Sequence, residues 1–171
     1  MKKLVLLAVA CALIVVGIVL FVALGTVRSG PPPLGTGNDG TGLQCESNTI
    51  GQPVTVGIFA LENNGSHAVR ISAVMLSGGQ GQKMASPAYL VPIRDSTLLG
   101  AQPWPPAGAA WKLRQLAAGG QIAPHAALNL VFAQERTSDR TRPAAVQVTY
   151  TADGRNYSLT EAVRVVVAAN C

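Results

Sequence analysis

The chain has 171 residues, a length that fits one folded domain with attached segments rather than a multidomain protein. Hydrophobic residues make up 49% of it and charged residues 12%, so the composition excludes a disordered chain and is more apolar than an ordinary soluble domain. The formal net charge is +5. From Cys45 to Cys171, ten basic residues stand against seven acidic ones, an excess too small to indicate nucleic-acid binding.

The first apolar segment is long enough to cross a membrane. Residues 4–24 are 21 consecutive residues without a charge, and as a helix they extend about 30 Å, the thickness of the hydrocarbon core of a bilayer. Lys2 and Lys3 precede this segment, whereas only Arg28 follows it closely, so the positive-inside rule places the N-terminus in the cytoplasm. We therefore expect residues 1–27 to be an anchor in the cell membrane and the rest of the chain to be extracytoplasmic.

Two kinds of processing are alternatives to a retained anchor. A signal peptidase could cleave after Gly25, because Ala23 and Gly25 are small, but the apolar core of a secretory signal has only about 7–15 residues. A lipoprotein signal could end at Cys11, which follows Ala10, although the chain stays apolar for 13 more residues. The retained anchor fits the length of the apolar run best.

Residues 28–44 are rich in proline and then in glycine. Pro31, Pro32 and Pro33 form a short stiff step, and the glycines that follow favour a flexible chain. We therefore predict that residues 28–44 are an unpacked linker. The folded domain is then expected to begin at Cys45 and to run to Cys171.

The two cysteines outside the predicted anchor mark the two ends of this domain. Cys45 lies where the linker gives way to strand-like sequence, and Cys171 is the last residue of the chain. Disulfides form and persist outside the cytoplasm. We therefore expect a Cys45–Cys171 disulfide that joins the first and last segments of the domain.

The predicted domain contains short runs in which apolar residues alternate with others, the pattern of β-strands. Asn64-Gly65 is predicted to close a hairpin between the first two long runs, and Asp153-Gly154 a hairpin between the last two. The residues expected to share a face are Val54, Val56, Ile58 and Ala60; Val69, Ile71, Ala73 and Met75; Leu128, Leu130 and Phe132; Val146, Val148 and Tyr150; and Tyr157, Leu159, Val163, Val165 and Val167.

These runs predict an all-β domain. Further strands are expected at Cys45, near residues 89–93 and near residues 111–113, which brings the count to about seven. Seven short strands in 127 residues indicate an immunoglobulin-like or fibronectin-like antiparallel sandwich. Residues 111–118 fit a short helix that ends at Gly119-Gly120 as well as they fit a strand.

The predicted domain lacks the sequence patterns of a catalytic site. It has two histidines, His67 and His125, its acidic residues are scattered singly, and it has neither a nucleophile elbow nor a zinc-binding helix. With Met75 and Met84 as its only methionines, it also lacks the dense His/Met spacing of a copper site. We therefore expect no enzymatic activity, no cofactor and no metal site.

The long segment from Arg94 to Lys112 is the strongest candidate for a contact site. It contains Trp104 between prolines, and then Trp111. Loops of this length in compact sandwiches are often functional. Trp104 is either held outward, where it offers a flat face to a sugar ring or a partner protein, or folded back over one end of the core.

A second candidate contact site is a small basic turn. Arg136, Arg140 and Arg142 lie close together in the sequence, with three polar residues between the first two. Such a turn could contact an anionic wall polymer or lipid headgroups, and the alternative is a turn that is simply solvated.

In layout, the chain resembles single-pass membrane proteins of high-GC actinobacteria that display an immunoglobulin-like outer domain. The resemblance rests on the Ala/Val/Gly/Arg-rich composition, the Met1-Lys2-Lys3 start, the linker and the terminal Cys171, and it implies no functional residues. We expect a membrane-anchored, non-enzymatic binding module that contacts another envelope protein. The alternative is a receptor for a cell-wall or carbohydrate ligand that uses the Trp104 loop. An exposed Trp104 ring flanked by polar donors would favour the glycan, and a wider apolar patch would favour the protein.

Overall fold

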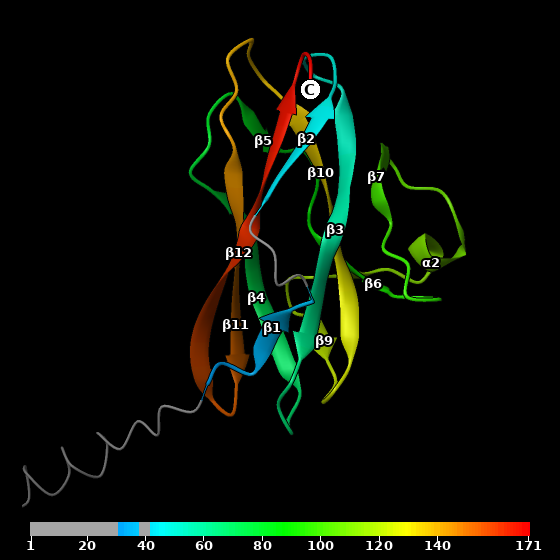
Figure 1. Ribbon diagram of the computed structural model, residues 1–171. Coiled ribbons are helices and arrows are strands. Elements are labelled where there is room, and N and C mark those ends of the chain that lie inside the picture. The colour runs from blue at the N-terminus through cyan, green and yellow to red at the C-terminus, as the bar shows by residue number, and fades with distance from the viewer. Residues whose placement is uncertain (1–30, 38–41) are drawn as a thin grey trace, which may run out of the picture. The chain divides into compact units, whose positions relative to one another are not determined.

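The computed structural model describes residues 31–37 and 42–171 (Figure 1). Their compact unit runs from Pro32 to Cys171. None of the helices in these two ranges is long and apolar enough to span a membrane. The predicted anchor at residues 1–27, which includes Cys11, lies outside the described residues.

Two sheets form an all-β sandwich (Figure 1). The main path of the first sheet is β1 (Leu34–Thr36), β3 (Pro53–Asn63), β10 (Ala127–Arg136), β6 (Tyr89–Pro92) and β8 (Gln115–Leu116). This sheet also contains β5 (Gln82–Met84), which pairs with β10, and β7 (Gly100–Pro103), which pairs with β3. The second sheet is β2 (Gly42–Ser47), β12 (Arg155–Ala168), β11 (Ala144–Ala152), β4 (Val69–Ser77) and β9 (Gln121–Ile122). Neighbouring strands are antiparallel, except that β2 runs parallel to β12.

The core lies between the two sheets. Its largest fully buried side chains include Phe59 and Phe132 from the first sheet and Ile71 and Tyr150 from the second. The Tyr150 ring also stacks on Tyr157, with the ring centroids 5.3 Å apart. Burial of such side chains is the main favourable contribution to folding.

The last predicted hairpin is confirmed. β11 and β12 pair directly through a tight turn, in which Asp153 and Gly154 have φ angles of 50° and 72°. Positive φ at both central residues is what a two-residue turn of this kind requires. The face expected for β11 is confirmed as well, because Val146, Val148 and Tyr150 are all buried in the core.

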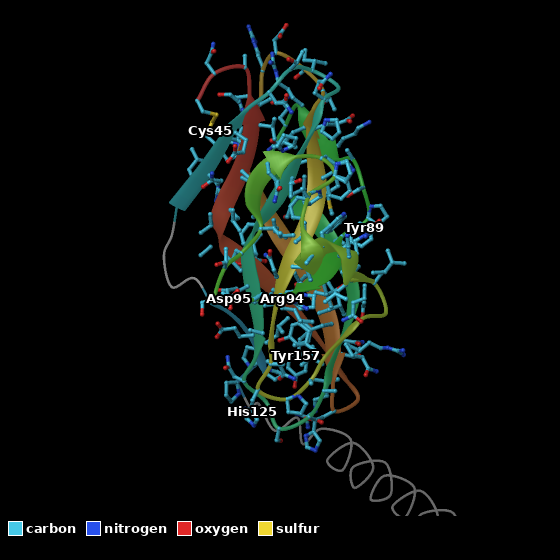
Figure 2. The ribbon with its side chains drawn as sticks, turned by 90° about the vertical axis from the view of Figure 1, so that its right-hand side faces the viewer. Cys45, Tyr89, Arg94, Asp95, His125 and Tyr157 are labelled. Atoms are coloured by element: carbon cyan, nitrogen blue, oxygen red, sulfur yellow. A yellow bond between two sulfur atoms is a disulfide. The ribbon has the colours of Figure 1, made fainter. Side chains whose placement is uncertain are left out.

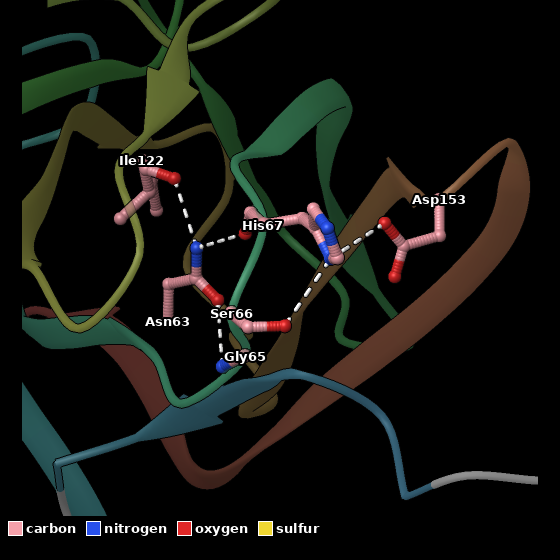
Figure 3. A network of polar contacts seen from close by, with 6 residues as sticks. All are labelled: Asn63, Gly65, Ser66, His67, Ile122 and Asp153. Carbon is pink, nitrogen blue, oxygen red and sulfur yellow. Dashed lines mark hydrogen bonds and ion pairs between the residues drawn. The ribbon is translucent and has the colours of Figure 1, made fainter.

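The hairpin predicted at Asn64-Gly65 is wrong. β3 and β4 belong to different sheets, and neither Asn64 nor Gly65 has a positive φ. The buried Asn63 side chain organises this crossing: Nδ2 donates to the carbonyls of His67 and Ile122 at 2.8 Å and 3.0 Å, and Oδ1 accepts from the Gly65 N–H (Figure 3). These hydrogen bonds hold the connection between β3 and β4 in place of the strand-to-strand hydrogen bonds that a hairpin would have, and the chain continues into the second sheet.

A β-bulge changes which residues of β3 face the core. Gly57 and Ile58 lie together opposite one β10 residue, Val131, so the alternation of β3 shifts by one position. Consequently Val56 is followed in the core by Phe59 and Leu61, while Ile58, within the bulge, is partly buried and still packs against the core, and Ala60 is outside the core cluster.

A bulge in β4 has the same effect. Ser72 has no partner in the ladder between Ile71 and Ala73. After it, Val74 and Leu76 pack against the core, and Met75 is exposed. The faces predicted for β3 and β4 are therefore correct up to each bulge, with Ile58 still in contact with the core, and wrong after it, since a one-residue shift moves every later side chain to the other face.

The described residues form twelve strands, more than the seven or so that were expected. The additional strands are short and lie mostly at sheet margins, where two to four residues pair without a long alternating run. Residues 111–118 were expected to form either a short helix or a strand, and the structure has one of each in this region: the helix α2 (Ala109–Lys112), followed by the strand β8. The domain also begins earlier than Cys45, because Leu34 in the predicted linker is fully buried and β1 pairs with β3.

The expected disulfide is confirmed. Cys45 and Cys171 are bonded, with their Cα atoms 5.7 Å apart and 126 positions apart in sequence. Cys45 also pairs with Val166 in the ladder between β2 and β12. The bond therefore fastens the C-terminal residue to an edge strand that is held by one neighbour.

Glu161 is a buried acid that the alternating pattern of β12 did not single out. It lies where residues 161–163 bulge opposite Val146, its side chain is 3% exposed, and its Oε1 atom has no hydrogen-bond partner. Burial raises the pKa of Glu161 from 4.5 to about 7. Because an unpaired charge is costly to bury, the folded state favours the protonated acid.

We predict that Glu161→Gln stabilises the domain at alkaline pH. The pKa is higher in the folded state, so wild-type stability is unaffected by this group below pH 4.5, falls as the pH rises to about 7, and stays low above it. The glutamine variant lacks this loss and gains up to about 3 kcal/mol at pH 8. Urea unfolding of the full chain in detergent micelles at pH 5 and pH 8 measures the difference, and an equal gain at both values would contradict the prediction.

Candidate functional site

The candidate segment crosses the outer face of the first sheet. Residues 93–116, here called the strap, leave β6, form β7 beside β3 on the other side of β10, and return through α2 to form β8 beside β6 (Figure 1). β7 is fixed to β3 by pairing from Val54 to Gly57. The strap is therefore a structured element with both of its ends tied to the sheet.

A second apolar cluster lies between the strap and this outer face. Val91 and Val131 point away from the main core and pack with the buried Trp111. Partly buried residues complete the cluster: Tyr89, Leu99, Trp104 and Ala110. Trp104 is therefore folded back onto the protein, which is the second of the two predicted alternatives. It covers the outer face of the first sheet, however, and not one end of the core.

Three aromatic rings form the centre of the cluster. The Trp111 ring meets Tyr89 and Trp104 edge-on, with centroid distances of 5.1 Å and 5.2 Å. Tyr89 and Trp104 are 6.3 Å apart. Edge-to-face pairs of this kind add to the stability gained from burial. Figure 2 shows Tyr89 on the side of the sandwich that carries the strap.

Arg114 covers one face of Trp111. Its guanidinium carbon lies 4.5 Å from the Trp111 ring centroid and 5.7 Å from that of Tyr89. Its Nη1 atom also donates to the Trp111 carbonyl at 3.1 Å. This cation–π contact occupies a ring face that a sugar would need for stacking.

Leucines extend the apolar surface beyond the aromatic cluster. Leu113 and Leu116, at the end of the strap, are 53% and 54% exposed. They are close in sequence to the exposed cations Lys112 and Arg114. An exposed apolar pair beside an aromatic cluster and arginine has the composition of a protein-contact surface.

Asn129 ties the strap to the sheet, a role that the sequence analysis missed. Its Oδ1 accepts from the Leu99 N–H at 2.9 Å, and its Nδ2 donates to the carbonyls of Gly57 and Phe59 at 3.0 Å and 2.9 Å. The sequence does contain a signal for this role. Asparagine is unfavourable in a strand, so Asn129 between Leu128 and Leu130 indicates a side chain with a specific hydrogen-bonding role.

The three arginines of the basic turn have different environments. Arg136 is buried and makes structural contacts, donating to the carbonyls of Ser138 and Asn48 and to Asp139 at 2.6 Å. Arg140 and Arg142 are exposed. Arg136 is therefore unavailable to an anionic ligand.

A Ser66–His67–Asp153 grouping at one end of the sandwich is unsuited to nucleophilic catalysis (Figure 3). Ser66 Oγ and Asp153 Oδ1 approach the same ring atom, Nδ1 of His67, at 3.2 Å and 3.1 Å. A catalytic triad needs the two partners on different ring nitrogens. The His67 and Asp153 side chains are also 69% and 60% exposed. Across residues 31–37 and 42–171, no group of three His, Cys, Asp or Glu residues is placed to hold a metal ion.

Comparison with known proteins gives little further information. No protein-family model matches the chain, and no curated protein matches it. Among solved structures, it is similar to the secreted serine protease VesC from Vibrio cholerae, with 11% sequence identity and a TM-score of 0.35. The match covers 73% of this chain and 21% of that one, so the chain spans about a fifth of that protein's length. A likeness of this size carries no argument about activity.

Proposed function

We propose that the chain is a single-pass membrane protein whose extracytoplasmic, immunoglobulin-like domain is a non-enzymatic module that contacts another envelope protein through the strap. The observation that carries the proposal is the exposed apolar surface of Leu113 and Leu116 beside the Tyr89–Trp104–Trp111 cluster. Interface centres are enriched in aromatic residues and arginine, and leucines at their margin help to exclude water.

Strand order supports the immunoglobulin-like assignment. The path β1-β3-β10-β6 corresponds to strands A, B, E and D of that fold, and the path β12-β11-β4 corresponds to G, F and C. The Cys45–Cys171 bond differs from the antibody pattern, because it joins an edge strand to the C-terminal residue rather than two core strands.

The geometry favours a protein partner over a carbohydrate ligand. Arg114 lies over the Trp111 ring, and Trp104 is half-buried with its ring against Trp111. A stacking platform for sugars needs an exposed flat ring, whereas Leu113 and Leu116 widen the apolar patch. Recognition of a wall glycan through the Trp104 loop is the second candidate.

Photocrosslinking in intact cells tests the proposal. A benzophenone amino acid at Leu116 is expected to give one discrete protein adduct, and the same probe at Met75, an exposed position on β4 of the second sheet, is expected to give none. Adding Leu113→Glu should lower the adduct yield at Leu116 about fivefold or more, because it places a charge in the apolar surface that the partner would cover. Equal labelling from Leu116 and Met75 would contradict the proposal, and an adduct that muramidase digests would support the glycan instead.

A further inference from the structure

A groove opens between β2 and β7. It has a volume of about 330 Å³. Its lining comes from the end of β2 and the following loop, from the start of β3, and from β7: Glu46, Ser47, Asn48, Gln52, Pro53, Val54, Ala101, Gln102 and Pro103. The strap cluster of Tyr89, Trp104 and Trp111 does not line this groove.

The groove exists because the N-terminal segment changes sheets. β1 pairs with the far end of β3 in the first sheet, and β2 pairs with β12 in the second sheet. β7 then occupies the side of β3 from Val54 to Gly57, which β1 leaves uncovered. The result is a lateral opening with one strand edge on each side.

Each of these edges offers backbone hydrogen-bonding groups. In the part of the chain that the structure describes, β2 pairs only with β12, and β7 pairs only with β3. Strand edges of this kind are templates for the addition of another strand. A groove flanked by two of them matches an extended peptide better than a compact small molecule.

The groove has polar amide and hydroxyl side chains and one negative charge. Glu46 is half-buried at its wall and accepts from the Gln44 amide. None of the lining residues is basic. Arg136, which donates to the Asn48 carbonyl behind the groove, is already paired with Asp139.

Glu46 also lines a second, closed cavity, which a ligand in the groove does not enter. Glu46 and Gln134 both line this narrow cavity, which runs inward between the sheets and is too small for a water molecule. Gln134 is fully buried, its amide nitrogen donates to Gln82, and its Oε1 atom has no donor. The groove itself presents the Glu46 carboxylate with no cationic side chain among its lining residues, and an ammonium or guanidinium group of a ligand supplies that positive charge.

We propose that the groove binds an extended peptide segment of a partner protein, which adds to the edge of β2 as a strand and directs a lysine or arginine side chain to Glu46. The backbone bonds along β2 supply affinity, and the Glu46 carboxylate selects a basic residue. Part of the strap, β7, lines this groove, but neither the aromatic cluster nor Leu113 and Leu116 do, so the site goes beyond the contact proposed above and can fail or hold independently of it.

Binding of synthetic peptides to the full chain in detergent micelles tests this proposal. The probe is a fluorescent nine-residue Thr/Val peptide with lysine at its centre, and the matched peptide carries glutamate there. Fluorescence anisotropy should show the lysine peptide binding at least about tenfold more tightly than the glutamate peptide, and its affinity should fall as salt is added. Equal affinities for the two peptides would overturn the proposal.

Variants of the chain locate the binding. Glu46→Gln should weaken the lysine peptide about fivefold to tenfold, the effect of one charge-assisted bond. Ala101→Trp keeps the charge but fills the groove, and it should abolish binding. Glu62→Gln, on the opposite end of β3, is the matched control and should bind like wild type.

Two further results would count against the site. The first is that both Glu46→Gln and Ala101→Trp bind the lysine peptide with wild-type affinity while mass spectrometry shows an intact disulfide; this result would overturn the proposal. Binding of butylammonium as tightly as the lysine peptide would replace strand addition by a simple cation site. Photocrosslinking at Leu116 should be unchanged in Glu46→Gln, which separates a failure here from a failure of the strap contact.

Discussion

Replacement of both Cys45 and Cys171 by serine is expected to lower the free energy of unfolding by about 4–5 kcal/mol. The bond closes a loop of 126 positions, and a loop of this length restricts the unfolded chain strongly. β2 also loses its covalent attachment to the chain end, and it is otherwise held only by β12 among the described residues. Urea unfolding of the full chain in detergent micelles, followed by tryptophan fluorescence, measures the loss.

Two controls separate this effect from a side-chain effect. Wild-type protein reduced with dithiothreitol should unfold at the same urea concentration as the double serine variant. A Cys11→Ser variant should unfold like oxidised wild type, because Cys11 takes no part in the Cys45–Cys171 bond. Equal stability of the oxidised wild type and the double variant would contradict the expected loss.

The sequence predicted the elements that depend on local patterns. Alternation alone located β11 and its buried face, and the Asp153-Gly154 pair located the last hairpin, because both signals lie within a few consecutive residues. The disulfide followed from the positions of the two cysteines and the predicted compartment.

Other features depend on partners far away in sequence. The bulge at Gly57 and Ile58 exists only in relation to Val131 of β10, so no local window reveals that the face of β3 changes. The Asn64-Gly65 signal was misread because Asn63 bonds to the carbonyl of Ile122, 59 positions away. The strap is a similar case, since its path is set by the outward-facing Val91 and Val131.

The buried linker residue Leu34 shows a related difficulty. Composition marked residues 28–44 as unpacked, and a single leucine among prolines and glycines does not alter an average. The pairing of Leu34 with Asn63 nevertheless places its side chain in the core. A single large apolar residue in a Pro/Gly segment is therefore a better guide to packing than the composition of the whole segment.

Asn129→Ala is expected to lower the free energy of unfolding by about 3–5 kcal/mol and to detach the strap. The substitution leaves three backbone groups without their partner: the carbonyls of Gly57 and Phe59 and the N–H of Leu99. Each buried polar group left unpaired costs about 1–3 kcal/mol, and water entering under the strap offsets part of this cost. The loss therefore exceeds that expected from the removal of a surface side chain.

Two measurements on the same variant distinguish the strap from the sheet. Urea unfolding gives the total loss of stability, and Asn156→Ala, an exposed position in β12, should change it by less than about 0.5 kcal/mol. Limited trypsin digestion reports on the strap itself, because Arg94, Lys112 and Arg114 lie within it and are exposed. Cleavage at these residues should accelerate in Asn129→Ala under native conditions. If stability falls while this cleavage stays at the wild-type rate, Asn129 acts through the β3 bulge alone, and the strap is held by its apolar contacts with Val91 and Val131.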